Sequence, residues 1–312
     1  MMNVSFEVEL ANYLALRASL GLPTYQIGPL LKRLVQYLAQ NCPDGTVRVS
    51  QVLDWVCAEP SYSTSTQHVR LSAARVFLKH LKTVVPETEI PGSNLIARNQ
   101  RPEPFVFSDH QLRELLEIAG QIDSKKCITP LTLQTMFGLM ACTGLRPGEA
   151  MRLKTSQVIL DELAPRLLIS RTKFNKTRFV PLHITTAEHL KTYGFSQSTK
   201  REFFFNSKEG KQINRITLHR IFQDVIAKTS IRVCKSKPHP TLHSLRHTFA
   251  VHRLLHWYDE GQDVRELLPN LSVYLGHSDP ASSYWYVTCT PDLMTAAASR
   301  FEDYGSGRGG RQ

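Results

Sequence analysis

The chain has 312 residues, and at one to two hundred residues per domain this length predicts two domains. Its 38 Lys and Arg residues against 27 Asp and Glu residues give a net charge of +11, and a hydrophobic share of 42% excludes wholesale disorder. The sequence contains no bilayer-spanning run, and we expect no secretory leader, so it predicts a cytoplasmic protein with no membrane partner. Its six cysteines include no Cys-x-x-Cys pair, so we expect neither a disulfide framework nor a zinc ribbon.

Apolar residues at helical spacing predict four helices in the first ninety residues, and their short connections favour a small bundle. We expect these helices over residues 6–20, 25–40, 50–57 and 65–84, with Ser50 as the cap of the third. We assign residues 1–85 to this helical domain. The polar, proline-bearing stretch 86–106 has no clear periodicity and is expected to be a linker.

The second domain is expected over residues 107–303, with a flexible basic tail at 304–312. Ser108 and Asp109 precede an amphipathic helix, and a buried helix is expected to end at Gly144. The helices are predicted over residues 111–119, 130–143, 215–229, 244–258, 264–275, 281–288 and 293–301. Runs rich in Val, Ile, Leu and Phe predict strands over residues 157–161, 166–171 and 178–182. The fold class is therefore mainly α with a small antiparallel β-sheet.

The positive charge is concentrated in one part of the chain. Residues 166–237 contain 16 basic and 4 acidic residues, so this segment has a net charge of 16 − 4 = +12. Solvated surfaces usually interleave both signs, whereas this segment does not. The segment therefore predicts contact with a polyanion, although charge alone does not separate DNA from RNA or from an acidic protein.

The first of three notable segments is the sequence TGLRPGE at residues 143–149. Gly144 ends one helix and Pro147 suits the first position of the next. Arg146 is thus expected at a helix N-terminus, where backbone N–H groups already favour an anion and a guanidinium can hold two phosphate oxygens. Glu149, three residues later, is placed to orient Arg146.

The other two segments place histidines beside helix boundaries. HSLRHTFA at residues 243–250 puts His243 and Arg246 on one helical face. LGHSDP at residues 275–280 puts His277 in a turn, because Gly276 and Pro280 interrupt the helix. Tyr286 follows His277 by nine residues and is expected in a short helix that folds back toward the turn.

Some neighbouring residues have ordinary explanations. His247 and His252 fit satisfied core histidines, and Tyr284 and Trp285 fit packing residues. The pairs His243/His247 and His252/His256 have the i, i+4 spacing of metal ligands, but no third ligand stands at motif spacing. No metal and no cofactor are therefore expected.

The three segments, in this order, resemble the catalytic domain of the tyrosine recombinases, the phage-integrase family, over roughly residues 107–290. The resemblance implies that Tyr286 is the nucleophile and that the other catalytic residues are Arg146, Lys173, His243, Arg246 and His277. Lys173 is in RTKFNKTR at residues 171–178, between the second and third strands. Phe174 stands where the family commonly has glycine, so Lys176 remains an alternative to Lys173.

The resemblance implies a site-specific DNA recombinase of the integrase or transposon-encoded type. Such an enzyme forms a 3′-phosphotyrosine intermediate without metal or ATP. A tyrosine pKa of about 10 means that the phenol needs activation. Arg146 and Arg246 are expected to stabilise the phosphoryl oxygens, and Lys173 to protonate the leaving oxygen. His243 is a candidate general base or proton shuttle, and Glu149 supports Arg146.

The implied partners are double-stranded DNA, a homo-oligomer that is a tetramer on two duplexes, and accessory recombination or directionality proteins. The stripe Leu293, Ala297 and Phe301 either docks on a neighbouring subunit or packs within its own domain. Candidate phosphate contacts in the helical domain are Arg17, Lys32, Arg33, Arg70, Lys79 and Lys82. The alternatives are a type IB topoisomerase-like relaxase, a catalytically silent DNA-binding accessory protein and a metal-dependent nuclease.

Overall fold

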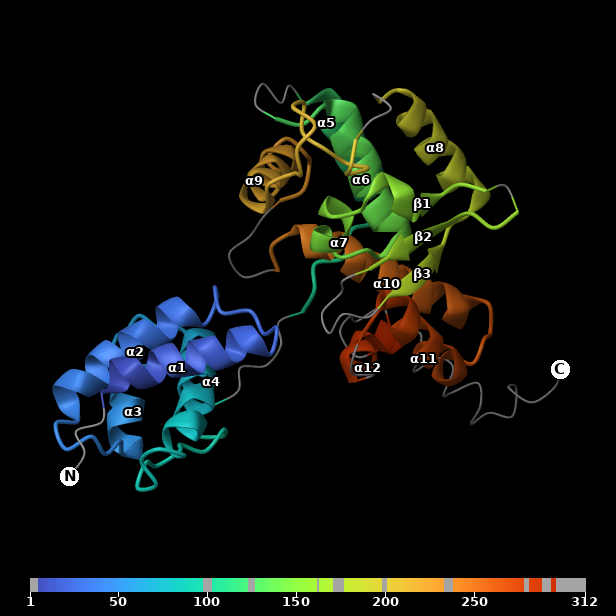
Figure 1. Cartoon of the computed structure of the whole chain (residues 1–312). Coiled ribbons are helices and arrows are strands. Elements are labelled where there is room, and N and C mark those ends of the chain that lie inside the picture. The colour runs from blue at the N-terminus through green and yellow to red at the C-terminus, as the bar shows by residue number, and fades with distance from the viewer. Residues whose placement is uncertain are drawn as a thin grey trace, which may run out of the picture. The chain divides into compact units, whose positions relative to one another are not determined.

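The computed structural model describes most of the chain, namely residues 5–97, 103–122, 127–161, 163–170, 177–197, 201–232, 238–277, 281–287 and 293–295. The chain divides into two compact units, residues 1–101 and 102–312, shown in blue to teal and in green to red in Figure 1. Over the described residues, no helix has the length and apolar character that crossing a membrane requires.

The first unit is a bundle of four helices: α1 (Phe6–Ser19), α2 (Gly28–Asn41), α3 (Val49–Val56) and α4 (Thr64–Leu81). The helical spacing of apolar residues predicted all four, because one face of each helix contributes to a shared core that includes the fully buried Leu34, Leu38 and Phe77. The predicted cap at Ser50 is wrong. Helix α3 begins at Val49, and the backbone N–H of Arg48 donates to the side chain of Gln51.

Arg70 does not take the surface position expected of a phosphate contact. Its side chain is buried, with the guanidinium carbon 3.8 Å from the ring centroid of Trp55 and 4.7 Å from that of Tyr62. Burial lowers the pKa of Arg70, and stacking on two aromatic faces stabilises the cation there. The prediction that Arg70 contacts DNA is therefore wrong. Among the other candidate contacts, the exposed residues are Lys32, Arg33, Lys79 and Lys82.

The second unit contains a three-stranded antiparallel sheet and helices around it (Figure 1). The strand order is β1-β2-β3, and the register pairs Leu167 with Val180. The strands are β1 (Val158–Ile159), β2 (Arg166–Ile169) and β3 (Arg178–Pro181), preceded by the short 3-10 helix η1 (Thr155–Gln157). The helices are α5 (Asp109–Gln121), α6 (Pro130–Thr143), α7 (Pro147–Met151), α8 (Ile184–Phe195), α9 (Arg215–Ile226), α10 (Leu242–Asp259), α11 (Val264–Leu275) and α12 (Ala281–Val287). The predicted fold class is confirmed.

Helix α8 was not predicted from the sequence. It begins with Ile184, Thr185 and Thr186, which are β-branched residues that weaken a helical signal. The side chain of His183 caps the helix by accepting from the backbone N–H of Thr185. Its buried residues are spaced three apart, at 187, 190 and 193, and this spacing is the signal that could have identified the helix.

The long helix α10 connects two hydrophobic cores of the second unit. Leu242 and Leu245, in its first turn, belong to the core formed with α5, α6, the sheet and α9. Val251 and Leu254 belong to a second core that also contains Tyr286. Residues 246 and 247 therefore lie where α10 passes from one core to the other, and rigid packing on both sides holds them in place.

Two helices end at glycines in the left-handed conformation. Gly144 ends α6 with φ 63°, and Gly276 ends α11 with φ 68°. A Cβ at Gly144 would lie 2.6 Å from the Phe249 ring, and one at Gly276 would lie 2.8 Å from the guanidinium of Arg178. Both positions therefore require glycine for their backbone angle and for the close approach of a neighbouring side chain.

Candidate active site

Arg246 connects the ends of two helices. Its side chain is buried, Nη1 donates to the Gly144 carbonyl at 2.8 Å, and Nη2 donates to the Leu275 carbonyl at 2.8 Å. These carbonyls lack partners within their own helices because they lie at C-termini. Burial, followed by the charge of Arg146, lowers the pKa of Arg246 to about 10, so the guanidinium remains charged at neutral pH.

Arg146 precedes the first residue of α7, as its sequence context predicted. Its Nη1 donates to Glu149 Oε1 at 2.9 Å, and its Nη2 donates to the Gly276 carbonyl at 2.8 Å. The side chain is 30% exposed, so the guanidinium can be reached from solvent. The expected contact between Arg146 and Glu149 is present.

Glu149 is shared between two guanidinium groups. Its side chain is 4% exposed, and Arg178 donates to both carboxylate oxygens, at 3.0 and 2.9 Å. Burial by itself raises the pKa of Glu149, but the hydrogen bonds and charge of Arg178, together with the backbone N–H and charge of Arg146, lower it to about 2. Arg178 was not predicted as a site residue. It is the first residue of β3, and its distance in sequence from Glu149 hides the pairing.

Three arginines bind three successive carbonyls at the end of α11. Nε of Arg178 donates to the carbonyl of Tyr274 at 2.9 Å, while Arg246 and Arg146 donate to those of the next two residues. With Glu149 as the carboxylate in this group, the charge sum is 3 − 1 = +2. This C-terminal arginine cluster is defined as Arg146, Arg178 and Arg246. The guanidinium groups of Arg146 and Arg246 are thereby fixed beside the turn that contains His277. The net positive charge of the cluster favours an anion there.

His243 lies in the first turn of α10, one helical turn before Arg246. Its side chain is exposed, unlike that of Arg246. Partial desolvation of the ring, followed by the charges of Arg246, Arg215 and Arg146, lowers the pKa of His243. The imidazole is therefore mainly neutral at pH 7, and can donate or accept a hydrogen bond.

His277 and Tyr286 lie together, as the sequence predicted. Their rings are stacked, with centroids 6.3 Å apart and planes at 13°. Nδ1 of His277 lies 2.6 Å from the Ser283 hydroxyl, which belongs to α12. This contact orients the imidazole and fixes which nitrogen remains for a ligand.

The hydroxyl of Tyr286 contacts His247, for which the sequence predicts a core position. The oxygen lies 2.9 Å from His247 Nδ1, and the tyrosine is 2% exposed. Trp285 packs edge-on against the His247 ring, with centroids 5.7 Å apart, so the expectation of a packing role fits this residue. The same expectation for Tyr284 is wrong because Tyr284 is 55% exposed.

Lys173 and Lys176 lie outside the described residues, as does the sequence between His277 and α12. Strand β2 ends at Ile169 and β3 begins at Arg178, so both lysines belong to the connection between these strands. The choice between them as the general acid therefore stays a prediction from sequence.

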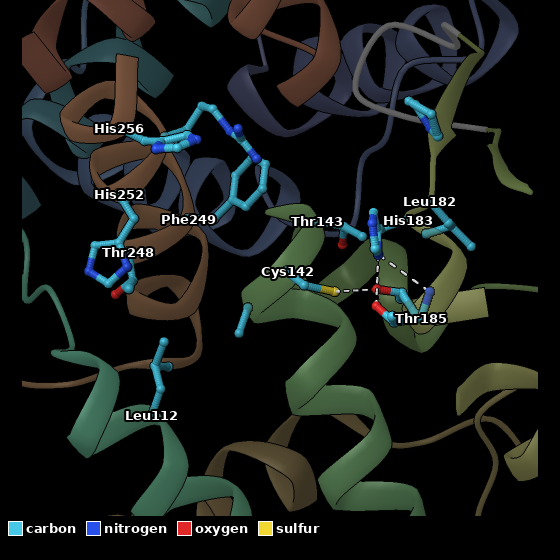
Figure 2. A pocket seen from close by; sticks show the side chains of 14 residues that line it. Leu112, Cys142, Thr143, Leu182, His183, Thr185, Thr248, Phe249, His252 and His256 are labelled. Atoms are coloured by element: carbon cyan, nitrogen blue, oxygen red, sulfur yellow. Dashed lines mark hydrogen bonds between the residues drawn. The ribbon is translucent and has the colours of Figure 1, made fainter. Parts of the chain in front are cut away.

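A pocket of about 520 Å³ lies between α6, α10 and the segment that leads into α8 (Figure 2). Figure 2 shows His252 and His256 on α10, Cys142 at the end of α6 and His183 before α8. The residues that line this pocket include none of the predicted catalytic side chains. Within the described parts of the chain, no three His, Cys, Asp or Glu side chains are grouped to hold a metal ion.

We expect Glu149→Gln to reveal the ionised carboxylate through the pH dependence of stability. Because the pKa of Glu149 is lower in the folded chain than its ordinary 4.5, ionisation stabilises the fold above that pH. This contribution, about 3 kcal/mol from the difference in pKa, is lost as the pH falls from about 4.5 toward 2. Denaturant unfolding should show the wild-type advantage over Glu149→Gln shrinking between pH 5 and 3. An advantage that stays constant over this range would contradict the assignment.

The comparisons with known proteins agree on one family. The phage integrase family model matches residues 106–291. The integrase/recombinase y4rB of Sinorhizobium fredii is 31% identical over 310 residues, which cover 96% of this chain and 97% of y4rB. The tyrosine recombinase XerD of Rhizobium meliloti is 30% identical over 238 residues, 73% of this chain and 71% of XerD. A solved lambda integrase tetramer bound to a Holliday junction has a similar fold, with TM-score 0.67, 15% identity, and coverage of 91% of this chain and 78% of that one.

Proposed function

The chain belongs to the phage integrase family and is a site-specific tyrosine recombinase, an enzyme that transfers DNA strands, and from this premise we propose which residues perform the reaction. Tyr286 attacks a phosphate of double-stranded DNA and becomes linked to the 3′ end. The phosphotyrosine bond conserves the energy of the phosphodiester bond until a 5′ hydroxyl reverses the step. The proposed reaction uses no metal ion and no ATP.

One observation supports this proposal above the others: the end of α11 brings two guanidinium groups, His277 and Tyr286 into one neighbourhood. Burial and the charge of Arg146 lower the pKa of Arg246, whereas the nearby Tyr286 raises it. The phenol hydroxyl contacts His247, the residue that follows Arg246, so the phenol lies beside a guanidinium that would bind phosphate. Such an arrangement suits the transfer of a phosphoryl group, because the charge that develops meets preorganised cations.

Each of the other residues has a proposed role. Arg146 and Arg246 bind the non-bridging oxygens of the scissile phosphate. His243 and His277 donate hydrogen bonds to the same phosphate. Lys173 protonates the 5′ oxygen as it leaves, because an alkoxide is a poor leaving group without a proton.

The burial of Tyr286 sets a condition on this reaction. With 2% of its surface exposed, the residue cannot contact a phosphate in the conformation described, and the same holds for Arg246, which is 3% exposed. Helix α12, which packs against α10 and α11, must therefore shift when DNA binds. We propose that this shift is how DNA binding activates the enzyme.

The DNA surface is proposed to include the basic segment 166–237. Its described cations on and around α9 are exposed: Lys208, Lys211, Arg215, Arg220, Lys228 and Arg232. Contacts of this kind bind phosphates and give affinity that falls with salt. We propose that the enzyme acts in the cytoplasm, with accessory recombination or directionality proteins as further partners.

A homotetramer on two DNA duplexes is proposed as the working assembly. The lambda integrase structure, which has the same fold, is a tetramer on a Holliday junction. Leu293, the part of the C-terminal stripe that the structure describes, is fully buried in the core that contains Tyr286. In this single chain Leu293 thus packs within its own domain, and docking on a neighbour would involve the residues after 295.

The alternatives receive less support. The names of y4rB and XerD describe recombinases, which favours recombination over a type IB topoisomerase-like relaxase. The catalytic set in the sequence disfavours a silent accessory protein. A metal-dependent nuclease lacks a grouped set of ligands in the described residues.

Covalent capture tests the proposed function directly. The full chain is incubated in EDTA with nicked duplexes of random sequence, and DNA that remains attached under denaturing conditions is amplified and sequenced. We expect a covalent protein–DNA product and an enriched sequence, because a nick lets the short 5′ fragment diffuse away. Cleavage that requires added Mg²⁺, or no covalent product from any duplex, would contradict the proposal.

A further inference from the structure

The hydroxyl of Tyr286 makes a contact to which the proposed reaction assigns no chemistry. His247 Nδ1 lies 2.9 Å from the phenolic oxygen, and the two ring centroids are 5.6 Å apart. Trp285 packs edge-on against the same imidazole. Two consecutive residues of α12 thus hold His247, and the 2% exposure of Tyr286 shields the contact from water.

A buried phenol needs a hydrogen-bond partner, but a backbone carbonyl would be sufficient if satisfying the hydroxyl were the only requirement. An imidazole differs because it exchanges a proton near neutral pH, whereas a phenol does so near pH 10. His247 also follows Arg246 directly on α10. The same helical turn therefore fixes a phosphate-binding cation and a proton acceptor relative to one another.

The other ionisable groups of the site are less suited to take the proton of Tyr286. Glu149 is bound by two guanidinium groups and, with a pKa of about 2, is a weak base. The ring of His277 lies parallel to that of Tyr286, and its Nδ1 contacts Ser283. His243, the candidate base from the sequence, is exposed one turn earlier on α10. His247 presents a ring nitrogen to the hydroxyl itself.

We propose that His247 is the general base of strand cleavage, an inference that rests on the proposed role of Tyr286 as the nucleophile and that requires the hydrogen bond between the two residues to persist when α12 shifts on DNA binding. The phenol proton passes to Nδ1 of His247 while the phenolic oxygen bonds to phosphorus. The bond between phosphorus and the 5′ oxygen breaks, and that oxygen takes a proton from the general acid. During rejoining, the imidazolium returns its proton to the departing phenolate, so His247 is neutral again after each cycle.

The test compares His247→Asn with the wild type, using the nicked duplex that covalent capture on the wild type selects. Asparagine keeps a hydrogen-bonding group at this position but cannot take up a proton. We expect single-turnover formation of the covalent product at pH 7 to fall about 100-fold, the usual contribution of a general base. His256→Asn, also on α10 but exposed, is the matched control and should react at the wild-type rate.

Replacing Tyr286 by 3,5-difluorotyrosine separates a chemical role from a structural one. Fluorine lowers the pKa of the phenol toward neutrality, so the nucleophile ionises without a base. In the His247→Asn background, we expect this substitution to restore most of the lost rate at pH 8. Arg246 on α10 and His277 after α11 also face this contact. Both residues are unchanged in every variant, so a difference in rate between variants is assigned to position 247 or to the phenol.

Before the rates are compared, the variants are matched to the wild type for thermal unfolding and for affinity to the duplex. His247→Gln replaces His247→Asn if the latter fails to match. An unchanged rate in the variant, or a loss that difluorotyrosine does not restore, would overturn the proposal for His247. A wild type that forms no covalent product would instead contradict the proposed function itself, so the two failures are distinguishable.

Discussion

Replacing Tyr286 by phenylalanine is expected to abolish the covalent protein–DNA product while the chain remains folded. The change removes the oxygen that attacks phosphorus, and no neighbouring group can take its place in the link to DNA. The ring keeps its position in the core with Leu254 and Leu268. Because one hydrogen bond to His247 is lost, the free energy of unfolding should fall by about 1 kcal/mol.

A denaturing gel of the reaction with the nicked duplex provides the measurement. Tyr284→Phe is the matched control, since this residue lies two positions earlier on α12 and is 55% exposed. We expect the covalent band for the wild type and for Tyr284→Phe. A band that survives Tyr286→Phe but disappears in Tyr284→Phe would show that the nucleophile is assigned to the wrong tyrosine.

Arg246→Ala is expected to lower both activity and stability. The loss of a guanidinium that stabilises the phosphoryl oxygens should slow cleavage at least about 1,000-fold. The carbonyls of Gly144 and Leu275 would lose their donors, and about 3 kcal/mol of stability would be lost with them. Single-turnover cleavage and denaturant unfolding measure the two effects separately.

Arg146→Ala provides the comparison for this prediction. Arg146 is 30% exposed, whereas Arg246 is 3% exposed, so water can replace the contacts of Arg146 more readily. We expect a comparable loss of cleavage with a clearly smaller loss of stability. Equal destabilisation by both changes would contradict the view that burial makes Arg246 the structural centre of the site.

Local sequence signals predicted the helices and strands because each amphipathic pattern repeats within a few residues. The helices α6 and α11 were predicted with their observed ends, since Gly144 and Gly276 mark the stops. Helix α8 was missed because its first turn is β-branched. The helix breaks at Gly276 and Pro280 predicted that Tyr286 folds back toward His277, because Tyr286 follows His277 by only nine residues of sequence.

The parts that the sequence could not predict depend on contacts between distant residues. Arg178 joins the site through Glu149, 29 residues earlier, and through the Tyr274 carbonyl, 96 residues later. His247 was interpreted as a core residue because one sequence position does not say which side chain approaches it from α12. A surface position is the usual one for a charged side chain, and the sequence therefore predicts it for Arg70. The stacking of Arg70 on Trp55 and Tyr62 depends on the tertiary structure.

The C-terminal arginine cluster has a consequence for synthesis of the enzyme. Arg146 binds a carbonyl 130 residues later in the chain, and Arg246 binds one 29 residues later. A ribosome-bound fragment that stops before Gly276 therefore lacks one of the two acceptors of the Arg146 side chain and keeps only Glu149. Because the proposed nucleophile, Tyr286, comes later still in the chain, we expect a fragment that ends at this point to be unable to cleave DNA.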